Sequence, residues 1–214
     1  MNREQEDVQA AKVRVRQAVT ARLATMTPER RRDAGIALVR QLAGLSVLRE
    51  ARTVMLFLSL PTEIDTWPTF QWLWREGKRT VVPRLGDAGP ASARVPLSER
   101  PMDPVLLAPA DVASPAAHPA LRPGSLGILE PFDAPAVPVE DLDVILLPCA
   151  AVDRRGNRLG KGGGFFDRFL CRPEVRAVSI VLAFQEQVLD EVPVTGDDFP
   201  VLRVVTDQEM WGFE

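Results

Sequence analysis

The N-terminal part of the chain carries apolar residues at helical spacing. At 100° per residue the members of this stripe fall within about 80° of one another, and they are Val8, Val15, Val19, Leu23 and Met26. The stripe predicts an amphipathic first helix. A second helix is expected directly after it, because Thr27 suits the N-cap and Pro28 the first helical position.

Basic residues interrupt the apolar stripe of the first helix. Lys12 falls inside the stripe and Arg16 on its edge, whereas Arg14 points elsewhere. A lysine in this position is either a snorkelling side chain on a surface helix or a cation aimed at an anionic ligand, and the pattern leaves both interpretations open. In the second helix, the run of arginines at positions 30–32 is interpreted as a solvated face rather than a binding patch.

A continuous apolar run at 54–58 predicts a strand buried on both faces of a parallel sheet. Thr66 is expected to cap the next helix, which ends at Gly77, and residues 80–82 form the next predicted strand. The core stripe of that helix is Trp67, Phe70, Leu73 and Trp74. Strand, helix and strand at this spacing predict a βαβ unit.

The second half of the chain supplies further strands after a region rich in proline. Residues 86–138 hold 11 of the 19 prolines and predict short strands, turns and long loops draped on the sheet. Residues 142–147, 178–183 and 202–205 are strand candidates. We therefore predict one α/β domain over residues 1–214: a three-layer, open, mostly parallel, Rossmann-like sheet with helices on both faces.

Composition excludes several kinds of active site. The 214 residues include one histidine, no tyrosine and two cysteines, so neither a multi-histidine metal site nor a four-cysteine zinc site is possible. A Ser-His-Asp triad would need His118. That residue lies between prolines and alanines, where we expect the imidazole to be poorly held, so a triad is not predicted.

Charge and termini indicate a soluble cytoplasmic protein. The net charge of −3 gives no general attraction to nucleic acid or to an anionic membrane. Cys149 and Cys171 do not form a redox motif and are expected to be reduced. The polar N-terminus does not resemble a secretory signal, and the apolar runs are far shorter than the ~20 residues that span a bilayer.

A glycine-rich segment after the 142–147 strand carries the most specific signal. Five of the 14 glycines lie at positions 156–164, and a short helix is predicted at 165–171. Glycines let backbone N–H groups approach an anion closely, and the loop brings them, with a helix N-terminus, to the carboxyl end of a strand. Arg158 and Lys161 add two cations. The design suits phosphate, although the spacing matches neither the Walker motif nor the dinucleotide pattern GxGxxG.

Asp167 follows this loop and has two interpretations. A carboxylate in a first helical turn gains about 0.3–1 kcal/mol from the helix dipole without any function. Beside a triphosphate, it could instead hold Mg²⁺ directly or through water.

The same residues resemble the signature of the 5-formyltetrahydrofolate cyclo-ligase family, also called 5,10-methenyltetrahydrofolate synthetases. The signature stands here as Arg158-Leu159-Gly160-Lys161-Gly162-Gly163-Gly164-Phe165-Phe166-Asp167. Further similarity follows in order: the pair Lys12 and Arg16, then residues 57–66, 82–84, 127–131 and 142–148. The resemblance covers roughly residues 8–206 and implies a fold like that of the NagB/RpiA/CoA transferase-like proteins.

By this resemblance, the protein is expected to convert ATP and 5-formyltetrahydrofolate to 5,10-methenyltetrahydrofolate, ADP and phosphate with Mg²⁺. ATP phosphorylates the formyl oxygen, N10 closes the ring and phosphate leaves. The implied partners are these small molecules, with neither nucleic acid nor membrane, and the chain is expected to be a monomer.

The resemblance also assigns the site residues. The implied catalytic residues are Lys161 and Arg158. The implied ATP-binding residues are Lys12, Arg16, Arg158, Leu159, Gly160, Lys161, Gly162, Gly163, Gly164, Phe165 and Phe166. Leu58, Glu63, Lys161 and Phe165 are implied for the folate, and Asp167 and Asp198 for the metal.

Three positions depart from the family pattern. Phe165 and Phe166 stand where tyrosine is usual, residues 148–152 differ from the usual strand end, and Leu202 replaces an aspartate. Stacking on a ring survives the loss of a hydroxyl, whereas its hydrogen bond, worth about 0.5–1.5 kcal/mol, does not. Two alternatives stay open: a divergent relative that uses ATP on another formyl or amide substrate, and a nucleotide-binding regulator without turnover.

Overall fold

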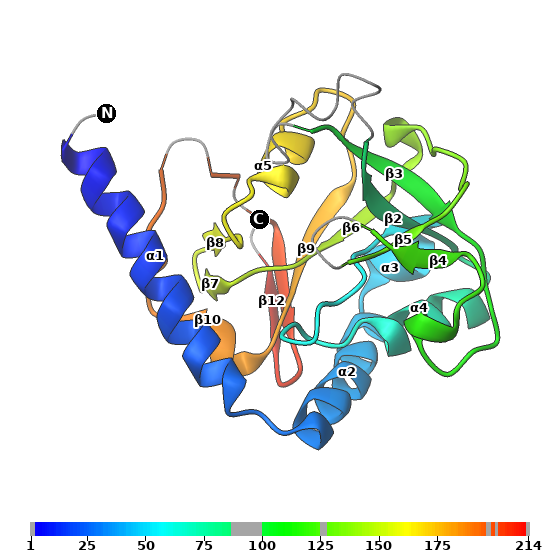
Figure 1. The fold of residues 1–214 in the computed structure, drawn as a ribbon, viewed down its shortest axis with the longest axis horizontal. Coiled ribbons are helices and arrows are strands. Elements are labelled where there is room, and N and C mark those ends of the chain that lie inside the picture. The colour runs from blue at the N-terminus through cyan, green and yellow to red at the C-terminus, as the bar shows by residue number, and fades with distance from the viewer. Residues whose placement is uncertain (1–2, 87–99, 125–127, 196–197, 200, 213–214) are drawn as a thin grey trace.

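A mostly parallel sheet forms the centre of the protein (Figure 1). The computed structural model describes residues 3–86, 100–124, 128–195, 198–199 and 201–212. Among these, seven strands pair in the order β12-β11-β9-β6-β1-β2-β3. Their bounds are β1 Thr53–Met55, β2 Arg79–Leu85, β3 Met102–Leu107, β6 Val144–Leu147, β9 Val178–Ala183, β11 Arg203–Thr206 and β12 Met210–Gly212. The strands from β11 to β2 are parallel, and the edge strands β12 and β3 are antiparallel to their neighbours.

The apolar runs in the sequence become central strands because both of their faces are covered. Val144 and Leu146 of β6 point into one apolar core, whereas Ile145 and Leu147 point into the other. This alternation is the consequence of the two-residue period of a strand. The expected three-layer α/β architecture is therefore confirmed.

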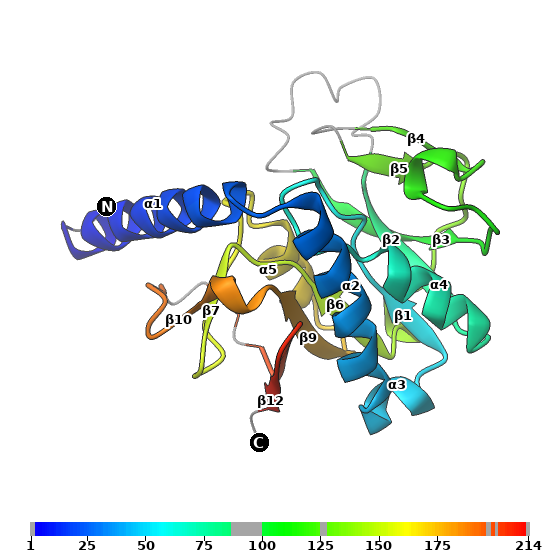
Figure 2. The ribbon, with the colours of Figure 1, turned by 90° about the horizontal axis from the view of Figure 1, so that it is seen from below.

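Helices cover the two faces unequally (Figure 2). The helices are α1 Arg3–Ala24, α2 Pro28–Ala43, α3 Ser46–Glu50, α4 Trp67–Arg75 and α5 Phe165–Leu170. The first core takes side chains from α2 and α4, such as Leu38 and Phe70. The second core takes Phe169 and Leu170 from the short α5. None of the described helices is long and apolar enough to cross a membrane.

Smaller elements complete the described chain. Short 3₁₀ turns lie at Pro115–Ala117, Val139–Asp141 and Gln185–Gln187. The strands β4 Leu121–Pro123 and β5 Leu129–Pro131 form a hairpin, and β7 Ala151–Asp153, β8 Arg158–Leu159 and β10 Val188–Leu189 form a small second sheet. The proline-rich region thus holds β3, β4 and β5 as short strands, as expected, while its residues 87–99 and 125–127 lie outside the described part.

The order of the strands creates a crevice between β1 and β6. The chain continues from β1 to β2 on one side and from β6 through β9 to β11 on the other. The loops that leave the carboxyl ends of β1 and β6 therefore run in opposite directions. Open α/β sheets bind their ligands in such a crevice.

Of the two helix caps that the sequence predicts, only that of α2 makes a side-chain hydrogen bond. Thr27 caps α2 by accepting the Arg30 N–H at 3.2 Å, with Pro28 as the first residue. Thr66 occupies the N-cap position of α4 as predicted, but its side chain makes no capping hydrogen bond. The Asp65 carboxylate accepts the Trp67 N–H instead, and the Thr66 hydroxyl donates to the Phe57 carbonyl at 2.7 Å.

The structure corrects two further expectations, one about the arginines at 30–32 and one about the end of the first helix. Arg30 does not belong to a solvated face, because it pairs with Asp207 at 2.7 Å and with Glu186 at 3.0 Å. Arg31 donates to the Leu23 carbonyl, and within the run only Arg32 is fully exposed. The first helix ends at Ala24, so Met26 of the predicted stripe lies beyond it.

The imidazole of His118 is held firmly, contrary to expectation. It is buried against Trp67 and Trp74, accepts the Ala120 N–H through Nδ1 and lies 2.9 Å from the Ala108 carbonyl through Nε2. Both nitrogens bind backbone groups, so this histidine serves the structure, and the expectation that it forms no triad holds.

The central position of β6 makes its core side chains essential to stability. Leu146→Ala is expected to lower the free energy of unfolding by about 2–5 kcal/mol, because the side chain is fully buried and leaves a cavity. Ile36→Ala, on an exposed part of α2, is the control and should change it by less than about 0.5 kcal/mol. Urea denaturation measures both, and equal effects would contradict this account of the core.

Candidate functional site

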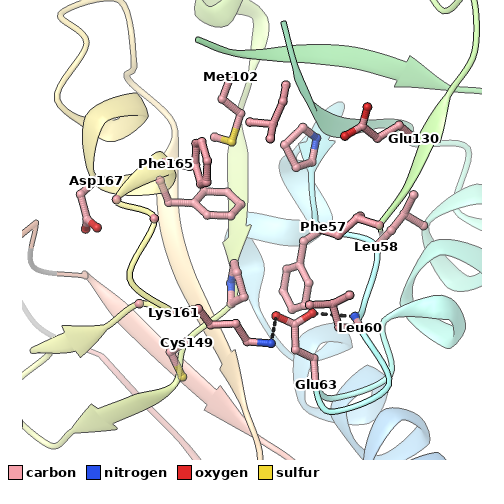
Figure 3. Close-up of a pocket in the computed structure, with 18 of the residues that line it drawn as sticks. Phe57, Leu58, Leu60, Glu63, Met102, Glu130, Cys149, Lys161, Phe165 and Asp167 are labelled. Atoms are coloured by element: carbon pink, nitrogen blue, oxygen red, sulfur yellow. Dashed lines mark hydrogen bonds and ion pairs between the residues drawn. The ribbon is translucent and has the colours of Figure 1, made fainter. Parts of the chain in front are cut away.

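A cavity of about 530 Å³ opens at the crevice between β1 and β6 (Figure 3). Its lining is mainly apolar and comes from six segments of the chain. The lining residues are Phe57, Leu58, Leu60 and Glu63 after β1; Pro148 and Cys149 after β6; Arg158, Gly160, Lys161, Gly163, Gly164, Phe165, Phe166 and Asp167 around the glycine-rich loop; and Pro83, Leu85, Met102, Ile128, Leu129 and Glu130. We name this space the apolar cavity.

The loop after β1 is held in place by its own polar side chains. The Ser59 hydroxyl donates to the Ile64 carbonyl at 2.8 Å, and the Thr66 N–H donates to Ser59 Oγ at 2.9 Å. Glu63 accepts the Leu60 N–H through Oε2 at 2.7 Å. These bonds fix a carboxylate at the wall of an apolar cavity.

Glu63 also pairs with the glycine-rich loop. Lys161 Nζ lies 2.8 Å from Glu63 Oε1, and the side chains of Glu63 and Lys161 are 9% and 42% exposed. The carboxylate is therefore enclosed, whereas the lysine that neutralises it reaches solvent. Two predicted substrate residues from distant parts of the chain are brought together here.

A second cavity, of about 830 Å³, lies on the other side of the glycine-rich loop. We name it the polar cavity. Its lining is Gln9, Lys12, Arg16, Gly160, Gly162, Gly164, Asp167, Arg168, Cys171, Thr195, Asp198 and Phe199. Gly160, Gly164 and Asp167 line both spaces, so the loop separates an apolar space from a space rich in cations.

The path of the glycine-rich loop requires glycine at specific positions. Gly162 has a φ of +109°, which other residues rarely adopt, and a Cβ on Gly163 would lie 2.5 Å from the Phe165 ring. No hydrogen bond joins the N–H groups of residues 161–164 to another described residue. The loop therefore presents backbone donors to a ligand.

The glycine-rich segment is anchored near its first glycine and again at Gly160. Before it, the buried Asp153 accepts the N–H groups of Arg155 and Asn157 and closes the β7–β8 turn. Within it, Arg16 Nε donates to the Gly160 carbonyl at 2.8 Å, which ties α1 to the loop. Arg16 lines the polar cavity as well.

Lys12 is buried, so the snorkelling interpretation does not hold. Its Nζ lies 2.5 Å from Asp198 Oδ2, and the Thr195 N–H and hydroxyl donate to the same oxygen. Burial alone would raise the pKa of the Asp198 carboxyl, but the hydrogen bonds from Lys12 and Thr195 outweigh it and lower that pKa. The carboxylate is thus kept charged beside the lysine, at the wall of the polar cavity.

Arg158 pairs with Asp167 beneath the loop. The Arg158 side chain is almost fully buried and donates to Asp167 Oδ1 and, at 3.4 Å, to the Pro148 carbonyl. Arg158, which is predicted to bind phosphate, is thus paired with Asp167, which is predicted to bind the metal. Leu159 is buried in the first core and lines neither cavity, so any contact with a nucleotide would involve its backbone.

The two predicted metal ligands, Asp167 and Asp198, line the same polar cavity. The described residues contain no group of three or more histidine, cysteine, aspartate or glutamate side chains that could hold a metal by itself. Mg²⁺ usually takes one or two carboxylates and completes its shell with water and phosphate oxygens. The donor set therefore fits Mg²⁺ that arrives with a phosphate ligand.

Several residues of the site gave no local sequence signal. Thr195, which orients Asp198, follows no recognisable motif, and Met102 comes from the proline-rich region. Cys149 is one of the residues at 148–152 that depart from the family pattern, and it lines the apolar cavity. Leu202, the third departure, is largely exposed.

Comparison with known proteins gives consistent results. A sequence model described as the 5-formyltetrahydrofolate cyclo-ligase family matches residues 8–207. The 5-formyltetrahydrofolate cyclo-ligase of Escherichia coli (strain K12) is 31% identical over 196 residues, 90% of this chain and 98% of the relative. The 5-formyltetrahydrofolate cyclo-ligase of Mus musculus is 27% identical over 206 residues, which are 92% of this chain and 94% of the relative. The solved 5,10-methenyltetrahydrofolate synthetase of Aquifex aeolicus has a TM-score of 0.75 at 26% identity and covers 94% of this chain and 92% of its own.

The two cysteines are expected to differ in reactivity. Burial raises the pKa of the Cys149 thiol to about 12, so near pH 8 it stays a neutral, enclosed thiol, whereas Cys171 is exposed. We expect a chromogenic disulfide reagent to react with one thiol per folded chain and with two after unfolding. Cys171→Ser should leave the folded protein unreactive, and two thiols reacting equally fast in the folded state would contradict this burial.

Proposed function

This chain belongs to the 5-formyltetrahydrofolate cyclo-ligase family, and we propose that it phosphorylates the formyl oxygen of its folate with ATP and Mg²⁺ before ring closure. Family membership makes the protein an enzyme that converts 5-formyltetrahydrofolate to 5,10-methenyltetrahydrofolate. The proposal adds the use of ATP, the release of ADP and phosphate, and the roles of individual residues.

The observation that carries the proposal is the position of the glycine-rich loop between two unlike cavities. Gly160 and Gly164 line the apolar cavity on one side and the polar cavity on the other. A reaction between a ring compound and a triphosphate needs such a boundary, because each substrate requires a different environment and their reacting atoms must meet.

The apolar cavity supports binding of the reduced folate. Leu58, Phe165 and Phe166 offer apolar surface for a flat ring system, and the Glu63 carboxylate accepts N–H groups from the ring edge. Phe165 and Phe166 keep the contact surface of an aromatic pair without its hydroxyl groups. A volume of about 530 Å³ falls in the range of small-molecule sites.

The polar cavity supports binding of the ATP phosphates. Lys12, Arg16 and Arg168 line it, and the N–H groups of Gly162 and Gly164, which also line it, add donors. The carboxylates of Asp167 and Asp198 would hold Mg²⁺ there. Bound to phosphate oxygens, the ion supplies charge neutralisation.

Phosphoryl transfer depends mainly on positioning and on neutralising charge. The formyl oxygen attacks the terminal phosphorus, a new P–O bond forms, and the bond to ADP breaks. N10 then attacks the formyl carbon and loses its proton, while the C–O bond breaks and phosphate leaves. In this scheme Lys161 neutralises the transferred group, and Arg158 acts by holding Asp167.

The proposal also places the enzyme in the cytoplasm as a monomer. Cys149 and Cys171 are free thiols, which suits a reducing compartment.

The direct test is formation of the methenyl product from 5-formyltetrahydrofolate and Mg-ATP, followed by its near-ultraviolet absorbance together with ADP. We expect both products in equal amounts from the unaltered protein. Lys161→Ala should lower kcat by about 10²–10³-fold, since it removes one charge that stabilises the transition state, and thermal unfolding checks that the variant is folded. ADP without methenyl product would indicate another substrate, and ATP binding without turnover would indicate a regulator.

The role of α1 in nucleotide binding has its own matched pair of variants. Arg16→Ala is expected to weaken binding of a non-hydrolysable ATP analogue by about tenfold or more, because a charged donor to the loop and to the phosphates is lost. Arg14→Ala, on the exposed side of the same helix, should bind like the unaltered protein. Calorimetric titration compares them, and an equal loss in both would refute a specific role for Arg16.

A further inference from the structure

Lys161 is directed away from the cavity in which the proposed function places the phosphates. Its loop neighbours Gly160 and Gly162 line the polar cavity, whereas Lys161 lines the apolar cavity and pairs with Glu63 (Figure 3). The charge of this lysine is therefore neutralised by a carboxylate of the proposed folate site.

The two partners of this ion pair are held very differently. Glu63 is enclosed, and its second oxygen is bound by the Leu60 N–H at 2.7 Å. Lys161 is 42% exposed and stands in a loop between glycines. If the pair separates, the lysine is the partner that can move.

Space for such a movement exists beside the pair. A third cavity, of about 230 Å³, is lined by both Glu63 and Lys161, and also by Arg16, which reaches the polar cavity. The ion pair therefore stands between the apolar cavity and a smaller space that adjoins the phosphate side. A lysine side chain that leaves Glu63 has room to turn.

Bound folate changes which groups satisfy the carboxylate of Glu63. The aminopyrimidinone edge of a reduced folate carries adjacent N–H donors, which satisfy a carboxylate without any cation. A carboxylate in apolar surroundings is costly unless it is paired or fully hydrogen-bonded. Before folate binds, Lys161 compensates the charge of the Glu63 carboxylate. After folate binds, the N–H donors of the ring do so.

We propose that Glu63 is a positioning residue for Lys161: it holds the lysine away from the phosphate site until reduced folate binds, and then releases it to the phosphates of ATP. This inference rests on the proposed function and adds the order of two events: reduced folate binds first, and Lys161 reaches the phosphates afterwards. Folate and ATP then bind with positive coupling, and the coupling is the same in both directions.

The central test is Glu63→Gln, which keeps the shape of the side chain and removes its charge. In the absence of folate, we expect this variant to bind the β,γ-imido analogue of ATP, with Mg²⁺, about fivefold or more tightly than the unaltered enzyme does. Calorimetric titration measures the affinity. Unchanged or weaker binding of the analogue would overturn the proposal.

Three further variants separate this effect from general electrostatics. Lys161→Met should abolish the coupling of analogue binding to 5-formyltetrahydrofolate, and adding Glu63→Gln to it should then have no effect on analogue binding. Glu191→Gln removes one negative charge from an exposed residue that lines none of the three cavities, and should bind the analogue nearly like the unaltered enzyme. A gain in Glu191→Gln equal to that in Glu63→Gln would overturn the specific role of Glu63.

The readouts distinguish this inference from the proposed function. Methenyl formation by the unaltered enzyme tests the function, whereas the affinity of the folate-free variants for the analogue tests the role of Glu63. If Glu63→Gln does not fold, as judged by thermal unfolding, the comparison of the unaltered enzyme with Lys161→Met still decides. Equal folate–analogue coupling in those two proteins would overturn the inference.

Discussion

The parallel pairing of β1 with β6 is the constraint on which the site depends. These strands lie at the centre of the sheet, and the chain leaves them toward opposite edges. Their side chains are buried on both faces, so the carboxyl ends of both strands are held rigidly where the loops diverge. The loop after β1 supplies Glu63, and the segment after β6 leads to Lys161. A rigid sheet thus fixes the roots of two loops that must meet around a ligand.

Charge in the site is arranged in pairs. Lys12 pairs with Asp198, Arg158 with Asp167, and Lys161 with Glu63. An enclosed cation without a partner is costly, and the paired carboxylate offsets that cost. The pairs differ in exposure: Lys12 and Arg158 are buried and fixed, whereas Lys161 reaches solvent. Of these three cations, Lys161 is therefore the least confined.

Much of the fold and part of the site followed from local pattern. The strands at 142–147 and 178–183, the cap at Thr27 and the loop at 156–164 were recognisable because strand period, cap chemistry and glycine content act over a few residues. The helix stripe also marked Lys12 as unusual. Local pattern could not show that Asp198, 186 positions away, is the partner of that lysine.

The sequence by itself therefore determined the elements, the glycine-rich loop and the kinds of chemistry available without a second histidine or any tyrosine. Only the tertiary structure decided which charges are paired, that His118 packs against Trp67 and Trp74, and that Met102 of the proline-rich region lines the apolar cavity. The physical reason is the range of the interactions. Backbone geometry and capping act between near neighbours, whereas ion pairs and cavity walls join segments that strand order alone brings together.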